Sequence, residues 1–231
     1  KWMWSNLRLF YIDDSTKLMY NGGNKMEMIK VSNGLTGKME GMTVITTAMS
    51  NNEHCQKLAQ CDGTICQHCY SHQALSFRPN VRKCYERNGE ILKNGIIPRD
   101  QLPFINAKYC RFESHGDLHN ITHLENYVNI CKKNPHCQFA LWTKQYDIIK
   151  EFFATHKQPR NLNIVVSSIL MNTPVDVKQF TDLGMRVKSF TVYDKEAAKD
   201  VEINCGGKKC KDCLNCYRKY GKVNVINELL K

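Results

Sequence analysis

Most cysteines of this chain fall into two tight groups, and closely spaced cysteine thiolates are typical ligands of metals and of iron–sulfur clusters. The first group holds Cys55, Cys61, Cys66 and Cys69. Two residues between Cys66 and Cys69 let both sulfurs face one centre, and an upstream sulfur can close the loop around a [4Fe-4S] cluster. We favour Cys61, Cys66 and Cys69 as ligands, with Cys55 as the alternative first ligand. Three protein ligands leave one iron open for a substrate or S-adenosylmethionine.

The second group is more compact and consists of Cys205, Cys210, Cys213 and Cys216. Its Cys-x2-Cys-x2-Cys core is similar to the runs that hold clusters in bacterial ferredoxins. Gly206-Gly207 gives the backbone freedom to wrap closely around a bound group. Structural zinc is the alternative at both groups, but zinc usually takes two Cys-x2-Cys pairs separated by a longer gap. We therefore expect a second [4Fe-4S] cluster that is fully ligated by four sulfurs.

Composition indicates a folded protein with reduced thiols. The chain has 231 residues, of which 42% are hydrophobic and 24% are charged, and these values exclude disorder across the whole chain. No apolar run suits a membrane helix, and the start has no signal-peptide pattern, so we expect a cytoplasmic protein without a membrane partner. Twelve cysteines without an export signal favour metal binding over disulfides.

The formal net charge of +11 raises the question of a polyanionic partner. Two bound clusters with seven thiolate ligands would lower this charge to about +8. A nucleic-acid partner stays open, although a solvated basic face is the commoner explanation of such a charge.

The pattern of elements predicts an α/β fold. Residues 1–41 form an irregular or β-rich lead-in, 42–200 an α/β domain with the first cysteine group, and 201–231 a C-terminal cluster-binding segment. The predicted strands are 42–47, 108–112, 137–143, 162–170 and 185–193, and the predicted helices are 80–94, 122–132, 146–155, 175–183 and 223–230. Strands alternating with helices indicate a parallel sheet with right-handed crossovers, either an open sheet or a partial barrel.

In both architectures the ligand site lies at the carboxyl ends of the strands. The first cysteine loop and the loop that contains Ser114 to Asp117 both follow predicted strands. We therefore expect the two loops to meet in space. Four further cysteines, Cys84, Cys110, Cys131 and Cys137, lie within predicted elements and are expected to act as small buried hydrophobes.

With these motifs in place, the chain resembles the phage-encoded gene product 88 family. The matching features are the Cys61 to Tyr70 loop, the segment from Arg111 to Asp117, the Trp142-Thr143-Lys144 strand end, and the terminal cysteine string followed by Tyr217. They cover residues 42 to 217 in the same order as in the family. The resemblance implies phage origin, hence the host cell cytoplasm, and metal binding, rather than one particular reaction.

A looser resemblance is to radical S-adenosylmethionine enzymes, which place a three-cysteine loop after the first strand of a partial (β/α) barrel. Their Gly-Gly-Glu-like motif ends the second strand, and Gly116-Asp117 occupies that place here. The cysteine spacing departs from theirs, with four residues rather than three between Cys61 and Cys66. The resemblance implies S-adenosylmethionine as a cofactor. Asp117 would accept hydrogen bonds from its ammonium group, whereas the alternative is a helix cap or a turn.

Three functions stay open at this point. The first is a radical-SAM-like enzyme with one open-iron cluster and one auxiliary cluster. The second is an electron-transfer or redox-sensing protein that works with an electron donor. The third is a zinc-stapled nucleic-acid-binding protein, motivated by the basic residues around the second group, which are Lys208, Lys209, Lys211, Arg218 and Lys219. Spacing alone identifies no catalytic residue and predicts no oligomeric state.

Overall fold

The computed structural model describes residues 28–34, 37–219 and 223–230, together with the backbone of three short strands before residue 27. Those strands, β1 (Ile12–Asp13), β2 (Leu18–Asn21) and β3 (Asn24–Met26), pair antiparallel in a sheet of their own. They lie within residues 1–41, the predicted lead-in. The turn expected at Gly22-Gly23 lies outside the described residues.

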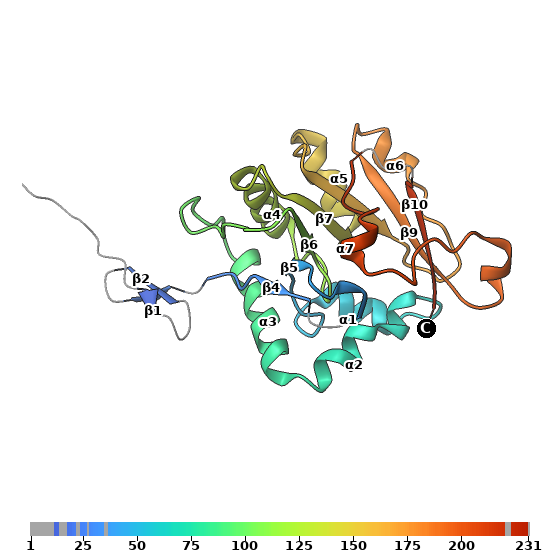
Figure 1. The fold of residues 1–231 in the computed structure, drawn as a ribbon, viewed down its shortest axis with the longest axis horizontal. Helices are drawn as coiled ribbons and strands as arrows, with labels where there is room; N and C mark the ends of the chain where they lie inside the picture. Colours follow the sequence, from blue (N-terminus) through green and yellow to red (C-terminus); the bar gives the residue numbers. More distant parts are fainter. Residues whose placement is uncertain are drawn as a thin grey trace, which may run out of the picture.

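A seven-stranded sheet organises the rest of the chain, in the order β10-β9-β8-β7-β6-β5-β4. Its strands are β4 (Ser32–Asn33), β5 (Thr43–Ile45), β6 (Tyr109–Phe112), β7 (Gln138–Thr143), β8 (Leu162–Ser167), β9 (Val187–Tyr193) and β10 (Val225–Leu229). Only the β4–β5 pair is antiparallel, and the other neighbours run parallel. The mixed α/β fold with a mostly parallel sheet is thereby confirmed. From β5 to β10, strand order in the sheet follows chain order (Figure 1).

Helices connect these strands close to where the sequence pattern predicts them. They are α1 (Glu53–Ala59), α2 (Tyr70–Ser76), α3 (Pro79–Lys93), α4 (Ile121–Lys133), α5 (Tyr146–Thr155), α6 (Lys178–Thr181) and α7 (Cys210–Cys213), with 3-10 turns η1 (Gly37–Met39), η2 (Ile65–His68) and η3 (Ala197–Asp200). Pro79 begins α3, where the missing N–H costs nothing, and Asn120 caps α4. The helix predicted over 175–183 is shortened to α6. In the described part of the chain, no helix has the length and apolarity that crossing a membrane requires.

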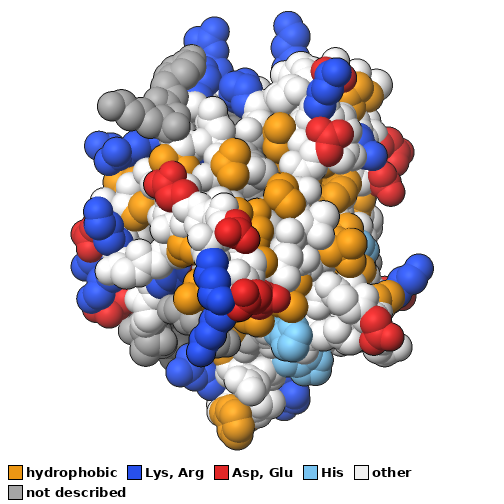
Figure 2. Space-filling view, turned by 90° about the vertical axis from the view of Figure 1, so that its right-hand side faces the viewer, with side chains coloured by type: hydrophobic (Ala, Val, Ile, Leu, Met, Phe, Trp, Pro, Cys, Tyr) orange, Lys and Arg blue, Asp and Glu red, His pale blue; other side chains and the backbone are white. Residues whose placement is uncertain are grey.

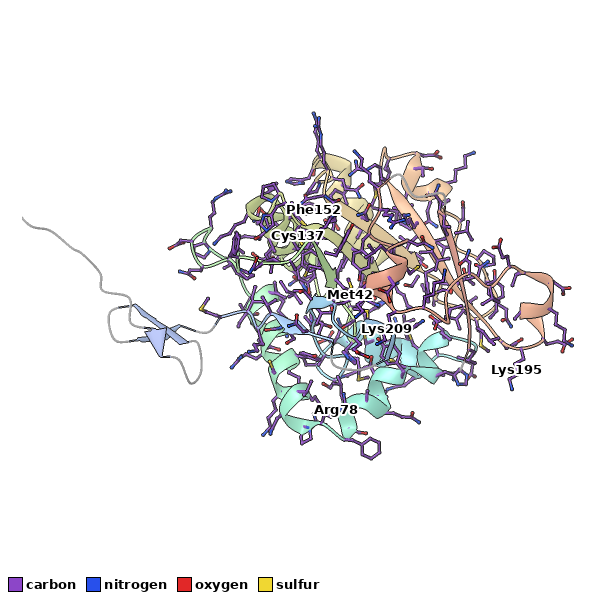
Figure 3. The ribbon with its side chains drawn as sticks, viewed as in Figure 1. Met42, Arg78, Cys137, Phe152, Lys195 and Lys209 are labelled. Carbon is purple, nitrogen blue, oxygen red and sulfur yellow. The ribbon has the colours of Figure 1, made fainter. Side chains whose placement is uncertain are left out.

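The main core lies between the sheet and helices α3 to α6. Strand β8 is buried along its whole length, as expected for a central parallel strand covered on both faces. The ring of Phe112 stacks on Tyr127 of α4 at 4.0 Å and on Phe139 of β7 at 4.8 Å between centroids. Cys110, Cys131 and Cys137 are fully buried in this core, as predicted, whereas Cys84 is only half-buried. Figure 3 labels Phe152 and Cys137 on this side.

A second, smaller core lies on the other face of the sheet, where the C-terminal segment covers it. Met42, Ala140 and Tyr217 form its centre, and half-buried side chains from the cysteine string pack around them. Met42 and Lys209 mark this region in Figure 3, and α7 crosses the same face in Figure 1. Helices α3 to α6 and the cysteine string, which includes α7, therefore cover different faces of one sheet.

The predicted C-terminal helix over residues 223–230 is wrong, because this segment forms the parallel edge strand β10. Val225 pairs with Ser189 and Leu229 with Tyr193 of β9. Val225 and Ile226 are β-branched, and Ile226 and Asn227 are buried by the pairing. In so short a segment, hydrogen bonds to the open edge of β9 stabilise a strand more than a weak helical pattern stabilises a helix.

Candidate metal centres

The first cysteine loop lies across the carboxyl edge of the sheet. Asn52 caps α1 by accepting a hydrogen bond from Cys55 N at 3.2 Å. The loop then reaches the end of β8, where Ile65 N donates to Ile169 O at 2.9 Å and Met171 N to Gly63 O at 3.2 Å. It therefore spans the sheet edge from the end of β5 to the end of β8.

The two loops that were expected to meet do so. Tyr70 OH, next to Cys69, donates to Ser114 O, and Asn52 Nδ2 donates to Asp117 O at 2.8 Å. Ser71 Oγ lies 3.2 Å from His115 Nδ1. These contacts hold the first cysteine loop against the loop after β6.

Three thiols of the first group share one electrostatic environment. Burial raises the pKa of the Cys55 thiol, and Asp117, Cys66 and Cys69 raise it further. Burial also raises the pKa of Cys66, whereas Lys144 lowers the pKa of both thiols. Asp117 and Lys144 therefore shift the pKa of Cys55 and of Cys66 in opposite directions.

Cys61, favoured as a ligand from spacing, makes a different contact. Its Sγ donates to Lys57 O, the carbonyl one turn earlier at the end of α1, at 3.2 Å. Cys55, by comparison, lies in the first turn of α1, and both Cys66 and Cys69 raise its pKa. The choice between Cys61 and Cys55 as the first ligand stays a prediction.

Asp117 is held inside the protein by three hydrogen bonds. Thr143 Oγ1 donates to its Oδ1 at 2.6 Å, Leu118 N to the same atom at 2.8 Å, and Lys144 N to Oδ2 at 2.8 Å. Burial raises the pKa of Asp117, and these donors oppose the rise. Asp117 therefore ties the end of β6 to the end of β7, and its role toward a ligand stays a prediction.

Gly116 is required by a close approach of two backbones. A Cβ atom at this position would lie 2.2 Å from Thr47 Oγ1 and 2.8 Å from Thr47 O. Any larger residue would push the loop after β6 away from the end of β5. Gly116 thus sets the spacing between the two loops of the first site.

Sequence reasoning missed Glu113, which follows β6 directly. Its side chain is fully buried, and its backbone has φ of 55°, an uncommon value for a non-glycine residue. Thr47 N and Oγ1 donate to Oε2 at 3.1 and 2.9 Å, Tyr127 OH donates to Oε1 at 2.5 Å, and His123 Nε2 lies 3.3 Å from Oε1.

Burial raises the pKa of Glu113, but the interactions with His123, Tyr127 and Thr47 outweigh this effect and lower it overall. The buried carboxylate of Glu113 therefore fixes the start of the loop after β6 to Thr47, after β5, and to Tyr127 of α4. The only signal for it in the sequence is an acidic residue at the end of a buried strand.

The second cysteine group lies on the face of the sheet opposite helices α3 to α6. Cys205 is anchored to β10, because its N–H donates to Asn227 O at 2.9 Å. Cys210 and Cys213 begin and end α7, and the left-handed Leu214 turns the chain toward Cys216. Burial raises the pKa of Cys216 to about 12, and the other three cysteines contribute to that rise. Cys216 is therefore within electrostatic reach of the other three thiols.

Tyr217 fixes this string to the sheet. Asn163 Nδ2 of β8 donates to Tyr217 O at 2.9 Å, and the Tyr217 ring lies 5.8 Å from the ring of Tyr109 and 6.1 Å from that of Trp142. Its side chain is only 1% exposed, and its hydroxyl has no hydrogen-bond partner among the described residues. A buried hydroxyl of this kind needs an acceptor.

Three cations border the second group. Lys38 Nζ lies 3.7 Å from Cys205 Sγ and pairs with Glu228. The Arg111 guanidinium lies 3.9 Å above the Trp142 ring and opposes the burial that raises the pKa of Cys210 and Cys216. Lys188 Nζ donates to Asn215 O at 2.7 Å, next to Cys216.

The donor sets suit iron–sulfur clusters in their chemistry. All twelve cysteines are free thiols. In the ranges that the structure describes, no three His, Cys, Asp or Glu side chains lie close enough to hold one metal ion. Thiolates on a cubane bind different irons and stand farther apart than thiolates on one zinc ion. Two buried polar atoms have no hydrogen-bond partner in the described residues, His54 Nε2 beside Cys55 and Tyr217 OH beside Cys216 in the sequence.

Comparison with known proteins identifies a family but no individual relative. No curated protein and no solved structure matches the chain. The sequence matches the gene product 88 family over residues 23–224, which span both cysteine groups and all strands from β3 to β9. The chain therefore belongs to the gene product 88 family.

Proposed function

We propose that this gene product 88 protein binds two [4Fe-4S] clusters and acts as a radical-SAM-like enzyme, with an open iron at the first site. The observation that carries this proposal is the position of the first cysteine loop. It lies at the carboxyl edge of a parallel sheet and meets the loop after the second parallel strand. Ligands of parallel α/β proteins bind at this edge.

The strand order supports a partial (β/α) barrel. A doubly wound sheet reverses its strand order at a switch point, and helices then cover both faces. Here the order from β5 to β10 never reverses, and the main core lies on one face. Right-handed crossovers that always step to the next strand favour a sheet that curls with its helices outside.

At the first site, we propose Cys55, Cys66 and Cys69 as the three ligands. Asp117 positions the backbone of Lys144, and the Lys144 side chain supplies positive charge for an acidic group of a ligand. When bound there, a reduced cluster with an open iron would give one electron to S-adenosylmethionine and cleave a carbon–sulfur bond. The loop spacing set by Gly116 keeps the two walls of the site together.

At the second site, four thiols would saturate a cluster that exchanges electrons without binding substrate. The cysteine string is packed on the sheet through Tyr217, which suits a role that needs no open iron. An external low-potential electron donor would then serve both clusters.

A second candidate function is a non-enzymatic electron carrier or redox sensor. The observation that favours it is the presence of Cys55 and Cys61 together, since either thiol could complete a fully ligated first cluster. Nucleic-acid binding has less support. Lys209 pairs with Glu40 at 3.0 Å, and on the face shown in Figure 2 basic side chains are interspersed with acidic ones.

The proposal is tested on reduced protein under anaerobic conditions. We expect the electron paramagnetic resonance signal of the reduced protein to change when S-adenosylmethionine is added, and the cofactor to be cleaved under reducing conditions. Cys66→Ala should abolish both effects, whereas Cys84→Ala, a half-buried helical cysteine, should preserve them. Two intact clusters with neither a spectral change nor cleavage would reject the enzyme and favour the electron carrier.

A further inference from the structure

The surroundings of the second cysteine group contain a buried positive charge without an acidic partner. Lys188 of β9 is 4% exposed. Its ammonium donates to Asn215 O at 2.7 Å and to Val223 O at 2.9 Å, and none of the ion pairs in the described part of the chain involves it. A buried ammonium is costly unless an anion compensates it.

The place of this charge points to the missing anion. Asn215 lies between Cys213 and Cys216, so the ammonium is held against the backbone of the cysteine string. The nearest acidic group on that string in sequence is Asp212, which is exposed, whereas Cys216 is close enough to influence Lys188. Lys188 is therefore held against the backbone of the segment that carries Cys213 and Cys216.

Two more cations complete the arrangement from other elements. Lys38 of η1 approaches Cys205, and Arg111 of β6 lies over Trp142 near Cys210 and Cys216. Two carboxylates lie on this side: Glu228 of β10 pairs with Lys38, and Glu40 pairs with Lys209, next to Cys210. Lys38, Arg111 and Lys188 thus come to the second cysteine group from three separate elements, η1, β6 and β9.

We propose that Lys38, Arg111 and Lys188 form a cationic cage that stabilises the reduced state of the second cluster and makes it an electron carrier rather than a structural staple. This inference rests on the proposed two-cluster function. A [4Fe-4S] core with four thiolates carries about −2 when oxidised and −3 when reduced. Reduction adds one electron, with no bond made or broken, and nearby positive charge favours the more negative state.

The test is a redox titration of the second cluster alone. A Cys66→Ala/Cys69→Ala background removes the first cluster, and dithionite serves as the one-electron reductant. We expect Lys188→Met to lower the equilibrium constant for reduction at least ten-fold, which is 59 mV for a one-electron couple. Lys188→Arg, which keeps the charge, should retain the original value.

Lys195→Met is the matched control, because it removes the same charge from an exposed loop far from α7 (Figure 3). If the Lys188→Met protein does not bind the second cluster, the same titration is made on Lys38→Met. Lys38 is partly exposed, so we expect its substitution to leave the cluster bound. A shift of the same sign supports the cage. An unchanged equilibrium constant in these variants overturns it while leaving two clusters in place, whereas a parent protein without iron and sulfide rejects the proposed function instead.

Discussion

The two cysteine groups of this protein lie in different surroundings, the first at an edge of the sheet and the second on one of its faces. The first lies at the carboxyl edge of the sheet, where Asp117 and Lys144 shift the pKa of Cys55 and of Cys66 in opposite directions. The second lies on a sheet face, is packed through Tyr217 and is bordered by three cations. An edge site suits ligand binding, whereas a packed, positively charged site suits holding and passing electrons.

The largest expected effect is the independent loss of each cluster. Cys213→Ala should remove the iron and sulfide of the second site and leave the first intact, because the two groups are attached to different loops. Cys66→Ala should do the reverse. Iron and sulfide analysis with Mössbauer spectroscopy measures this. If either substitution empties both sites, the two groups form one centre and the comparison fails.

The next effect sharpens the ligand choice at the first site. Cys55→Ala should lose the first cluster, whereas Cys61→Ala should keep about half or more of its iron, because Cys61 Sγ is bonded to Lys57 O. Iron content per chain is the readout. Loss in Cys61→Ala with retention in Cys55→Ala would restore the ligand set that spacing favours.

A smaller effect concerns the loop contact that shapes the first site. Gly116→Ala should lower the free energy of unfolding by about 1 to 3 kcal/mol, because a Cβ would overlap Thr47. Gly95→Ala is the control, since nothing lies within 4 Å of its added Cβ, and it should change stability by less than about 0.5 kcal/mol. Urea unfolding measures both. Equal stability of the two variants would mean that the loop is not tightly packed.

The smallest effect is a pH dependence near the first site. Burial lowers the pKa of His115 and of His119 to about 4. An unfolded histidine titrates near pH 6.5, so between about pH 6.5 and 4 the unfolded chain binds more protons. Stability is therefore fully present above about pH 6.5 and falls as the pH drops toward 4, by about 1 kcal/mol per histidine after allowance for partial exposure.

Chemical unfolding across this range measures the loss. His119→Gln should reduce it, and His72→Gln, which alters an exposed side chain, should not. A stability that is flat from pH 6.5 to 4 would contradict the burial of both imidazoles.

Local pattern was sufficient to predict much of the fold. Helices α3, α4 and α5 have strong periodicity, strands β5 to β9 are apolar runs, and the predicted ranges of these elements overlap those in the structure. The meeting of the two loops followed from a general property of parallel sheets. The pattern could not predict β10, because its conformation depends on pairing with the distant β9.

The parts of the site that escaped prediction all depend on tertiary contacts. Spacing favours Cys61 with Cys55 as the alternative first ligand, and this choice stays a prediction that the contact of Cys61 Sγ with Lys57 O bears on. Glu113 and Lys188 are charged residues inside buried strands or directly after them, and only packing reveals their partners. Sequence therefore identified the candidate ligands, and the structure identified what surrounds them.

The central claim is that the chain holds two cubane clusters, and iron with acid-labile sulfide on anaerobically purified protein tests it most directly. The account predicts about eight iron and eight sulfide per chain, falling to about half in Cys213→Ala. Zinc without sulfide would contradict the account and make both cysteine groups structural zinc sites.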